Sequence, residues 1–151
     1  MKHYLILLAL LLPILSGCSD RVKVRGTVTF EEDGSPLTIG TVKFVGEKTQ
    51  ATGHVQKNGT YSLGEIKPGD GVVPGTYKVG VYAQTGGGSD YAPLTYHVAR
   101  KLQDPETSGL TCEVKKGMTF DITVTKPLPG EEEDKRSVPS IRVGPPPSKK
   151  Q

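Results

Sequence analysis

The sequence of 151 residues has no tryptophan, only three histidines and only two cysteines. It contains no G-x-S-x-G, H-E-x-x-H or C-x-x-C spacing, so the usual signatures of serine hydrolases, zinc peptidases and dithiol oxidoreductases are missing. A nucleophile also needs a base and an orienting group nearby, and the sequence indicates no such set. We therefore expect no enzymatic activity, no catalytic residue, no cofactor and no metal.

The sequence also lacks a long apolar run outside its N-terminus. Residues 4–15 are nearly all apolar, and as a helix they would span roughly 18 Å, well short of a bilayer core of roughly 30 Å. Lys2 and His3 precede this run and small residues follow it, which is the order of a secretory signal. We predict a signal peptide over residues 1–17, helical in its apolar part, in preference to a transmembrane anchor.

Residues 15–18 read Leu-Ser-Gly-Cys and resemble the bacterial lipobox. The resemblance implies that the leader is cut before Cys18, that the thiol carries a diacylglyceryl group and that the new amino group is usually acylated. Two or three acyl chains hold a protein stably on a membrane, whereas one chain does not. The alternative is an ordinary secretory leader followed by a chance cysteine. We expect a lipid anchor at Cys18, with residues 18–21 as a short linker.

Ser19 follows the lipobox cysteine. In lipoproteins of double-membraned bacteria, an Asp at that position tends to retain the protein at the inner membrane. The resemblance therefore favours the outer membrane for a lipid-anchored protein of the cell envelope. Without its leader the chain loses only one charged side chain, Lys2, so its formal net charge falls from +3 to +2. A charge this small, with no basic cluster, predicts no nucleic-acid partner.

What the sequence has in abundance is alternation of apolar and polar residues with a period of two, which predicts strands. Turn residues rich in glycine, proline and aspartate separate these segments, and Asn58-Gly59 indicates a hairpin with a type I′ turn. We predict seven strands, over residues 22–30, 37–46, 50–56, a short stretch beginning at 61, 75–84, 109–115 and 118–126.

Seven short strands without an amphipathic helix predict an all-β fold, a seven-stranded β-sandwich of the immunoglobulin or transthyretin type over residues 22–126. Residues 85–108 contain no clear pattern and are predicted to be a long irregular segment. Residues 127–151 are rich in proline and charge, and we predict a disordered tail there. Cys112 alternates with Leu110 and Val114, so we expect a buried, unreactive thiol.

Several motifs follow one another along the chain. They are Val-x-Gly-x-Val-x-Phe at 24–30, Asp-Gly-x-Pro-Leu at 33–37, Asn-Gly-Thr-Tyr-Ser-Leu at 58–63 and Pro-Gly-Thr-Tyr-x-Val at 74–79. Their order resembles the carboxypeptidase regulatory-like domains, which are transthyretin-like sandwiches, and Asp-Pro-Glu-Thr-Ser-Gly-Leu at 104–110 is similar to a segment of small bacterial lipoproteins of this type. The resemblance covers residues 22–126 and implies no catalytic residues, because such domains usually serve as folding, spacing or interaction modules.

Three tyrosines are the candidate ligand contacts. Tyr91 and Tyr96 lie in the long irregular segment, and Tyr82 lies on the outward face of the preceding strand. Exposed tyrosines stack on sugar rings or contact a protein partner, and the alternative is that they pack over the edge of the sandwich. For His54 and His97 we expect exposed or hydrogen-bonded side chains, because a metal or catalytic role has no supporting spacing.

Two hypotheses follow from these observations. The first is a non-enzymatic interaction or scaffolding module that lipid on Cys18 holds at the membrane, where it contacts an envelope protein. The second is a module that binds carbohydrate or peptidoglycan through the tyrosines of the 82–96 region. Gly86-Gly87-Gly88 follows a strand but precedes no helix, so we predict a flexible loop there and no phosphate site. Glu31, Glu32, Asp33 and Asp70 match no calcium loop, so we expect solvated turn charges.

Overall fold

The structure is a computed structural model that describes residues 21–87 and 93–134. The predicted signal peptide, Cys18, Tyr91 and residues 135–151 of the predicted tail lie outside the described residues. The elements, in chain order, are β1 (Arg25–Phe30), β2 (Thr41–Val45), β3 (Gln50–His54), β4 (Thr60–Ser62), β5 (Gly75–Tyr82), β6 (Gln84–Thr85), β7 (Leu94–Tyr96), the 3-10 helix η1 (Arg100–Gln103), β8 (Leu110–Val114), β9 (Ile122–Val124) and β10 (Glu133–Asp134).

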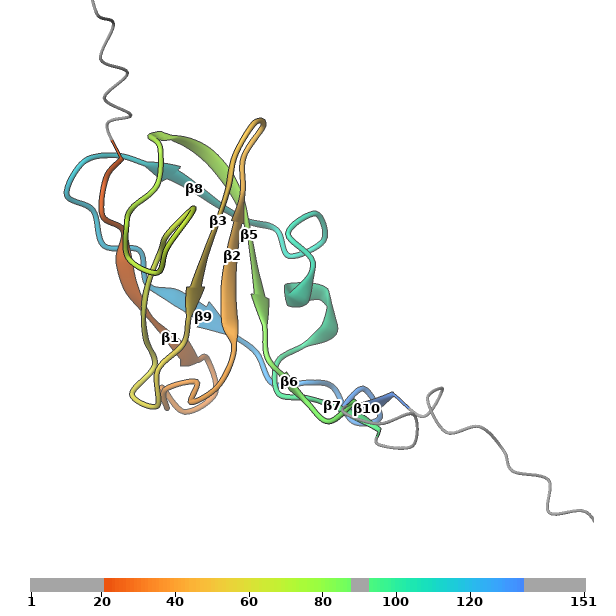
Figure 1. Cartoon of the computed structure of the whole chain (residues 1–151). Coiled ribbons are helices and arrows are strands. Elements are labelled where there is room, and N and C mark those ends of the chain that lie inside the picture. The colour runs from red at the N-terminus through yellow and green to blue at the C-terminus, as the bar shows by residue number, and fades with distance from the viewer. Residues whose placement is uncertain (1–20, 88–92, 135–151) are drawn as a thin grey trace, which may run out of the picture.

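Two sheets form a β-sandwich, which confirms the predicted fold class (Figure 1). One sheet has the order β3-β2-β5-β8 with antiparallel neighbours, and the other has the order β4-β1-β9. In the second sheet β1 is antiparallel to β4 but parallel to β9. All seven predicted strands are present and together they make up both sheets, while the structure assigns shorter spans to most of them.

The core lies between the two sheets and follows the period-two pattern of the sequence. Val24 and Val28 from the first strand segment, Phe44 from β2 and Val79 and Val81 from β5 are fully buried. Side chains at alternate positions of one strand point to the same face, so each strand buries one of its two rows. Phe44 packs edge to face on Phe120, with ring centroids 5.8 Å apart, and this contact ties the β2 sheet to the chain just before β9.

The hairpin between β3 and β4 is present, but its turn is not of type I′. That turn needs a positive φ at both central residues, and only Gly59 has one, at 81°. Gly59 N–H donates to the Gln56 carbonyl, and Gln56 N–H donates to the Thr60 carbonyl, at 2.8 Å each. The Asn58 carboxamide oxygen accepts from Thr60 Oγ1 at 2.7 Å. This asparagine bond stabilises the loop with a single left-handed residue.

A third sheet, of order β10-β7-β6, was not predicted. Strands β6 and β7 divide the segment expected to be irregular, and β10 lies inside the segment expected to be a disordered tail. The prediction that disorder begins at residue 127 is therefore wrong for residues 127–134. Two-residue strands carry too little hydrophobic pattern for a period of two to register, which is why the sequence did not reveal them.

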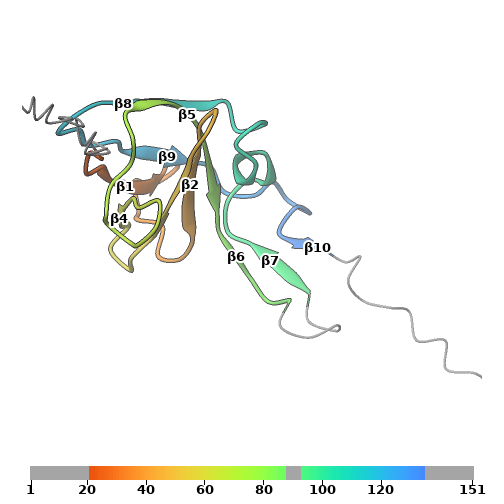
Figure 2. The same ribbon diagram turned by 45° about the horizontal axis from the view of Figure 1, so that its top comes forward.

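The two ends of the described chain lie at opposite ends of the molecule (Figures 1 and 2). The start of the described chain, drawn in red, lies beside the loop that joins β8 to β9, whereas the sheet of β6, β7 and β10 extends beyond the far end of the sandwich. We call the first region, residues 21–22 with the loop 64–73, the anchor end. We call the second region, residues 84–103 as far as they are described together with 128–134, the distal end.

Candidate functional site

Two of the three predicted tyrosines line one cleft at the distal end. Tyr82 closes β5 and Tyr96 closes β7, and each is partly exposed. Gln84 pairs with Tyr96 in the ladder of β6 and β7, which draws the end of β7 toward the end of β5. A cleft of about 360 Å³ lies between the two rings and η1. Tyr91 lies outside the described residues, so the structure places two of the three rings.

The other wall of this cleft comes from η1 and the residue after it. The Arg100 guanidinium carbon lies 4.7 Å from the centre of the Tyr96 ring, a cation–π contact that orients the ring. Gln103 is only 8% exposed, and its Nε2 has no hydrogen-bond partner among residues 21–87 and 93–134. A buried amide without a partner is costly. It lies against the cleft, whose remaining wall is Asp104. We name this group the tyrosine cleft: Tyr82, Gln84, Tyr96, Arg100, Gln103 and Asp104.

The chain after η1 is held against the outward face of β5. An ideal Cβ added to Gly80 would lie 2.8 Å from Pro105 Cδ, so the absence of a side chain lets Pro105 cross the strand at that point. Ser108 Oγ donates to the Val79 carbonyl, and Lys78 forms an ion pair with Glu106. The segment predicted as irregular therefore has two parts, of which β6 and β7 extend away from the sandwich and residues 97–108 cover β5.

No motif or spacing in the chain singled out Arg100 or Gln103. Both belong to a 3-10 helix of four residues, which is too short for a helical period to appear. Their contribution depends on the crossing of Pro105 over Gly80, a contact between residues 25 positions apart. Tyr82 and Tyr96 could be chosen from the sequence, because aromatic residues outside the alternating core pattern need a separate explanation.

The two histidines lie apart, in different clefts. His54 is exposed on β3, and its Nδ1 lies 3.3 Å from Thr41 Oγ1 on the neighbouring strand. His97 is partly buried, and its Nε2 lies 3.0 Å from Thr85 Oγ1. The exposed or hydrogen-bonded state expected for both is what the structure has. An enzymatic site built on both histidines would need them in one cleft, and no cleft described contains both.

Asp33, one of the acidic turn residues, is hydrogen-bonded to other residues of the protein. Asp33 accepts from Ser35 Oγ at 2.6 Å and from Ser35 N at 2.9 Å, and Lys126 Nζ lies 3.1 Å away. These three bonds lower the pKa of Asp33 to about 2. Within residues 21–87 and 93–134 there is no cluster of three or more His, Cys, Asp or Glu side chains able to hold a metal ion.

Cys112 is buried on β8 at 2% exposure, as its alternation with Leu110 and Val114 predicted. Burial raises the pKa of its thiol, because desolvation disfavours the thiolate. The thiolate is the reactive form of cysteine, so a buried neutral thiol is inert. Cys112 therefore contributes volume to the core and takes no part in the tyrosine cleft.

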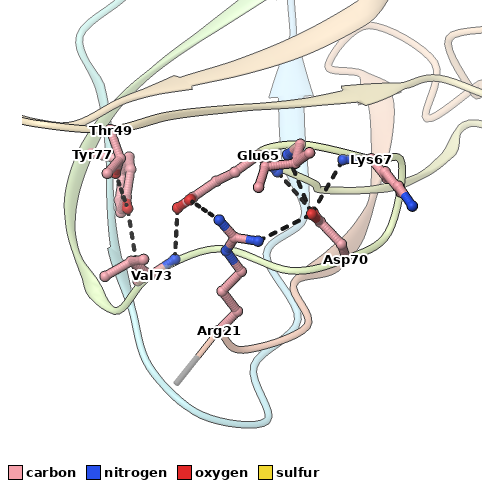
Figure 3. A network of polar contacts seen from close by, with 8 residues as sticks. Arg21, Thr49, Glu65, Lys67, Asp70, Val73 and Tyr77 are labelled. Carbon is pink, nitrogen blue, oxygen red and sulfur yellow. Dashed lines mark hydrogen bonds and ion pairs between the residues drawn. The ribbon is translucent and has the colours of Figure 1, made fainter. Parts of the chain in front are cut away.

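The anchor end contains a dense polar network around Arg21 (Figure 3). The guanidinium lies 3.3 Å from Glu65 Oε2 through one nitrogen and 3.3 Å from Asp70 Oδ2 through another. Glu65 Oε1 also accepts from Val73 N at 2.8 Å. Next to this pair, Val22 and Val72 exchange both backbone hydrogen bonds, at 2.8 and 2.9 Å. The first described residues are thus bound on both sides to the loop 64–73.

Asp70 organises that loop through its carboxylate. Its oxygens accept from the backbone N–H of Glu65 at 2.9 Å, of Ile66 at 3.3 Å and of Lys67 at 3.2 Å. Desolvation opposes the ionised form, but these donors and the Arg21 charge outweigh it, so the pKa of Asp70 lies below its ordinary value. The ionised carboxylate joins the loop to Arg21.

Comparison with known proteins leaves the family open. No known protein family and no curated protein matches this chain. Two solved structures are similar over 70% of it, both described as DUF3823 family proteins. The one from Bacteroides ovatus has 14% identity and a TM-score of 0.43, and the one from Parabacteroides merdae has 18% identity and a TM-score of 0.38. The match spans 45% and 46% of those chains, so this chain covers less than half the length of either.

The described residues include no helix long and apolar enough to cross a membrane.

Proposed function

We propose that the protein is a non-enzymatic interaction or scaffolding module that lipid on Cys18 holds at a bacterial cell envelope. The observation that carries the proposal is the Leu-Ser-Gly-Cys sequence at residues 15–18. Arg21, three residues after Cys18, is bound to Glu65 and Asp70. A chain fixed that close to its lipid holds the anchor end next to the membrane. The distal end, with the tyrosine cleft, then faces away from the bilayer.

The chain as it is made in a bacterial host tests the tether. Cys18→Ala should abolish incorporation of radiolabelled palmitate. The variant should either accumulate as the uncleaved precursor or, if its leader is cut, move from the membrane fraction to the soluble fraction. Cys112→Ala is the matched control, because its thiol is buried, and it should keep the label. Continued labelling of Cys18→Ala would refute the lipid anchor.

We further infer delivery to the outer membrane, because Ser19 and not Asp follows the cysteine. Sucrose-density fractionation of a double-membraned host measures this directly. Ser19→Asp should shift the protein from the dense outer-membrane fraction to the inner-membrane fraction, while Ser16→Ala, inside the leader, should leave it where it was. A wild-type protein that bands with the inner membrane would contradict the inference.

The sandwich is, on this proposal, a carboxypeptidase regulatory-like domain. Two features support the assignment: the order of the sequence motifs between residues 24 and 110, and sheets of four and three strands that contain all seven predicted strands. Domains of this kind usually space or join other parts of a protein, which fits a tethered module. An experimental structure in which the strand order differs from that of such domains would remove this assignment.

A second function, carbohydrate or peptidoglycan binding, is favoured by one observation. Tyr82 and Tyr96 line the same cleft together with Gln103, whose buried Nε2 has no partner within the described ranges. Aromatic rings stack on the apolar faces of sugars, and an amide adds a directed hydrogen bond. This function is compatible with the tether, because the distal end lies away from the start of the described chain (Figure 1).

Pull-down of the full chain with isolated cell-wall glycan tests the second function. Tyr82→Ala and Tyr96→Ala should each reduce retention, whereas Tyr96→Phe should preserve it, because the ring and not the hydroxyl stacks. Glu113→Gln, on the exposed outer row of β8, is the control and should bind as the wild type does. Equal retention of all four variants would exclude the tyrosine cleft as the glycan site.

A further inference from the structure

A second cleft, of about 600 Å³, lies along the outward side of the β4-β1-β9 sheet. Its volume is in the range of small-molecule sites, about 300–1,000 Å³. The cleft is formed where the β3–β4 hairpin bends from one sheet to the other, with Pro68 of the loop 64–73 as one wall. Its main polar side chains are Arg25, Thr27, His54, Gln56, Ser62 and Asp121. We call it the hairpin cleft.

Three charged or titratable groups of this cleft have unused hydrogen-bonding capacity. Among residues 21–87 and 93–134, the Arg25 side chain makes no hydrogen bond or ion pair, and His54 uses Nδ1 but not Nε2. Asp121 Oδ1 accepts from Thr27 N at 2.8 Å and from Thr27 Oγ1 at 2.7 Å, while Oδ2 has no partner in the part of the chain that the structure describes. At the anchor end, by contrast, Arg21 is paired with two carboxylates.

The strand geometry holds these groups at fixed spacing. Arg25 and Thr27 lie two positions apart on the same row of β1, which is roughly 7 Å along the strand. The two bonds from Thr27 hold Asp121 at the second position, while Ser62 pairs with Arg25 in the ladder. A cation and a carboxylate oxygen therefore face one cleft from neighbouring strands, with hydroxyl and amide groups around them.

Each group selects a different part of a ligand. A guanidinium pairs with a carboxylate through two parallel hydrogen bonds. An ionised carboxylate accepts only, so Asp121 Oδ2 selects hydroxyl or amide donors, and the Thr27 bonds keep the pKa of Asp121 below its ordinary value. Pro68 adds apolar wall, against which C–H groups pack. A sugar that carries both hydroxyls and a carboxylate combines all three features.

We propose that the hairpin cleft binds a short acidic oligosaccharide. Its carboxylate pairs with Arg25, and its hydroxyls donate to Asp121 Oδ2 and bond His54 Nε2. The inference goes beyond the proposed function, because it concerns a different surface from the tyrosine cleft and holds whether or not the chain is tethered. No residue of the hairpin cleft lines the tyrosine cleft, so substitutions separate the two sites.

Titration of the full chain, purified in detergent micelles, tests the proposal. The probes are a 1,4-linked trisaccharide of hexuronic acids and the same trisaccharide after reduction of its carboxylates to primary alcohols. Amide chemical shifts should move at Thr27 and Asp121 with the acidic probe. Arg25→Gln should weaken binding by at least about tenfold, the size of a lost charge-assisted hydrogen bond, and Arg25→Lys should restore part of it.

The controls separate this site from the other one. Lys23→Gln removes a cation two positions before Arg25 and outside the cleft lining, and it should leave binding within about twofold of the wild type. Tyr82→Ala should do the same. Equal affinity for the acidic and the reduced trisaccharide, shifts confined to the tyrosine cleft, or no binding by the folded wild-type chain would each overturn the proposal.

Discussion

The anchor end and the distal end are built on opposite principles. At the anchor end, the charged side chains of Arg21 and Asp70 are paired and backbone donors are used, although the buried Arg21 Nε has no hydrogen-bond partner among the described residues. At the distal end, a sheet of two- and three-residue strands extends from the sandwich, and the buried amide of Gln103 has no partner among the described residues. The first arrangement holds the first described residues against the loop 64–73. The second leaves the Gln103 amide nitrogen without a partner among the described residues beside the tyrosine cleft, an arrangement that fits the proposed tethered module.

The largest expected effect comes from filling space at the anchor end. An ideal Cβ on Gly64 would lie 1.9 Å from the Lys67 carbonyl oxygen, so Gly64→Ala should force the loop 64–73 open and cost about 3 kcal/mol of unfolding free energy or more. The distal match is Gly130→Ala, where φ is 91° but no atom lies within 4 Å, and where only backbone strain of about 1–2 kcal/mol is expected. Urea denaturation measures both. A larger loss for Gly130→Ala would reverse the comparison.

The next effect tests whether the polar network carries stability. Glu65→Ala leaves Val73 N and one Arg21 nitrogen without their partner, and Glu65 is only 9% exposed. We expect a loss of about 2 kcal/mol. Glu106→Ala removes the exposed pair with Lys78 near the distal end and should cost about 0.5 kcal/mol or less. Equal losses in thermal or urea unfolding would show that the anchor end is not the more tightly bound region.

A smaller effect should depend on pH. Because the folded pKa of Asp70 is lowered, its contribution to stability is present above the unfolded value of about 3.9 and is lost as pH falls through the folded value. Asp70→Asn should therefore have a lower Tm than the wild type at pH 7, and the two melting curves should converge in strong acid. Asp104→Asn, in the tyrosine cleft, serves as the distal control. A difference that persists unchanged to pH 2 would mean that Asp70 acts through its shape and not its charge.

The smallest effect is expected inside the tyrosine cleft. Arg100→Gln removes the cation above the Tyr96 ring and should lower the unfolding free energy by about 0.5–1 kcal/mol. Tyrosine fluorescence and thermal unfolding measure it. If Arg100→Gln lowered the unfolding free energy by more than Glu65→Ala does, the contacts of the distal end would contribute more to stability than those of the anchor end, which would contradict the comparison.

The strands of the sandwich were predictable because burial on one face imposes a period of two. Val79 and Val81 are both fully buried, and their alternation with polar residues located β5 directly. The hairpin at Asn58-Gly59 was also predictable, because its turn residues are adjacent in the chain. The turn type was not predictable, because it depends on the hydrogen bond that Asn58 accepts and on the backbone bonds of Gln56. These features depend on residues close together in the chain.

The clefts were not predictable, because they depend on contacts between distant residues. Tyr82 and Tyr96 were chosen as candidates from the sequence, but their common cleft requires the ladder of β6 and β7 and the crossing of Pro105. His54 was expected to be exposed or hydrogen-bonded, and its hydrogen bond to Thr41 agrees with that expectation. His54 and Asp121, 67 positions apart, line the hairpin cleft together, which requires the antiparallel pairing of β4 with β1 and the parallel pairing of β1 with β9.

The burial of Cys112 has a practical consequence for how the protein is made. The chain has only one other cysteine, Cys18, which precedes the sandwich, so Cys112 has no second thiol within the sandwich with which to form a disulfide. The sandwich therefore has no internal crosslink to form, and its folding needs neither an oxidising compartment nor a disulfide isomerase. Addition of a reductant should leave the melting curve of the folded chain unchanged, in contrast to small exported domains that depend on disulfides for their stability.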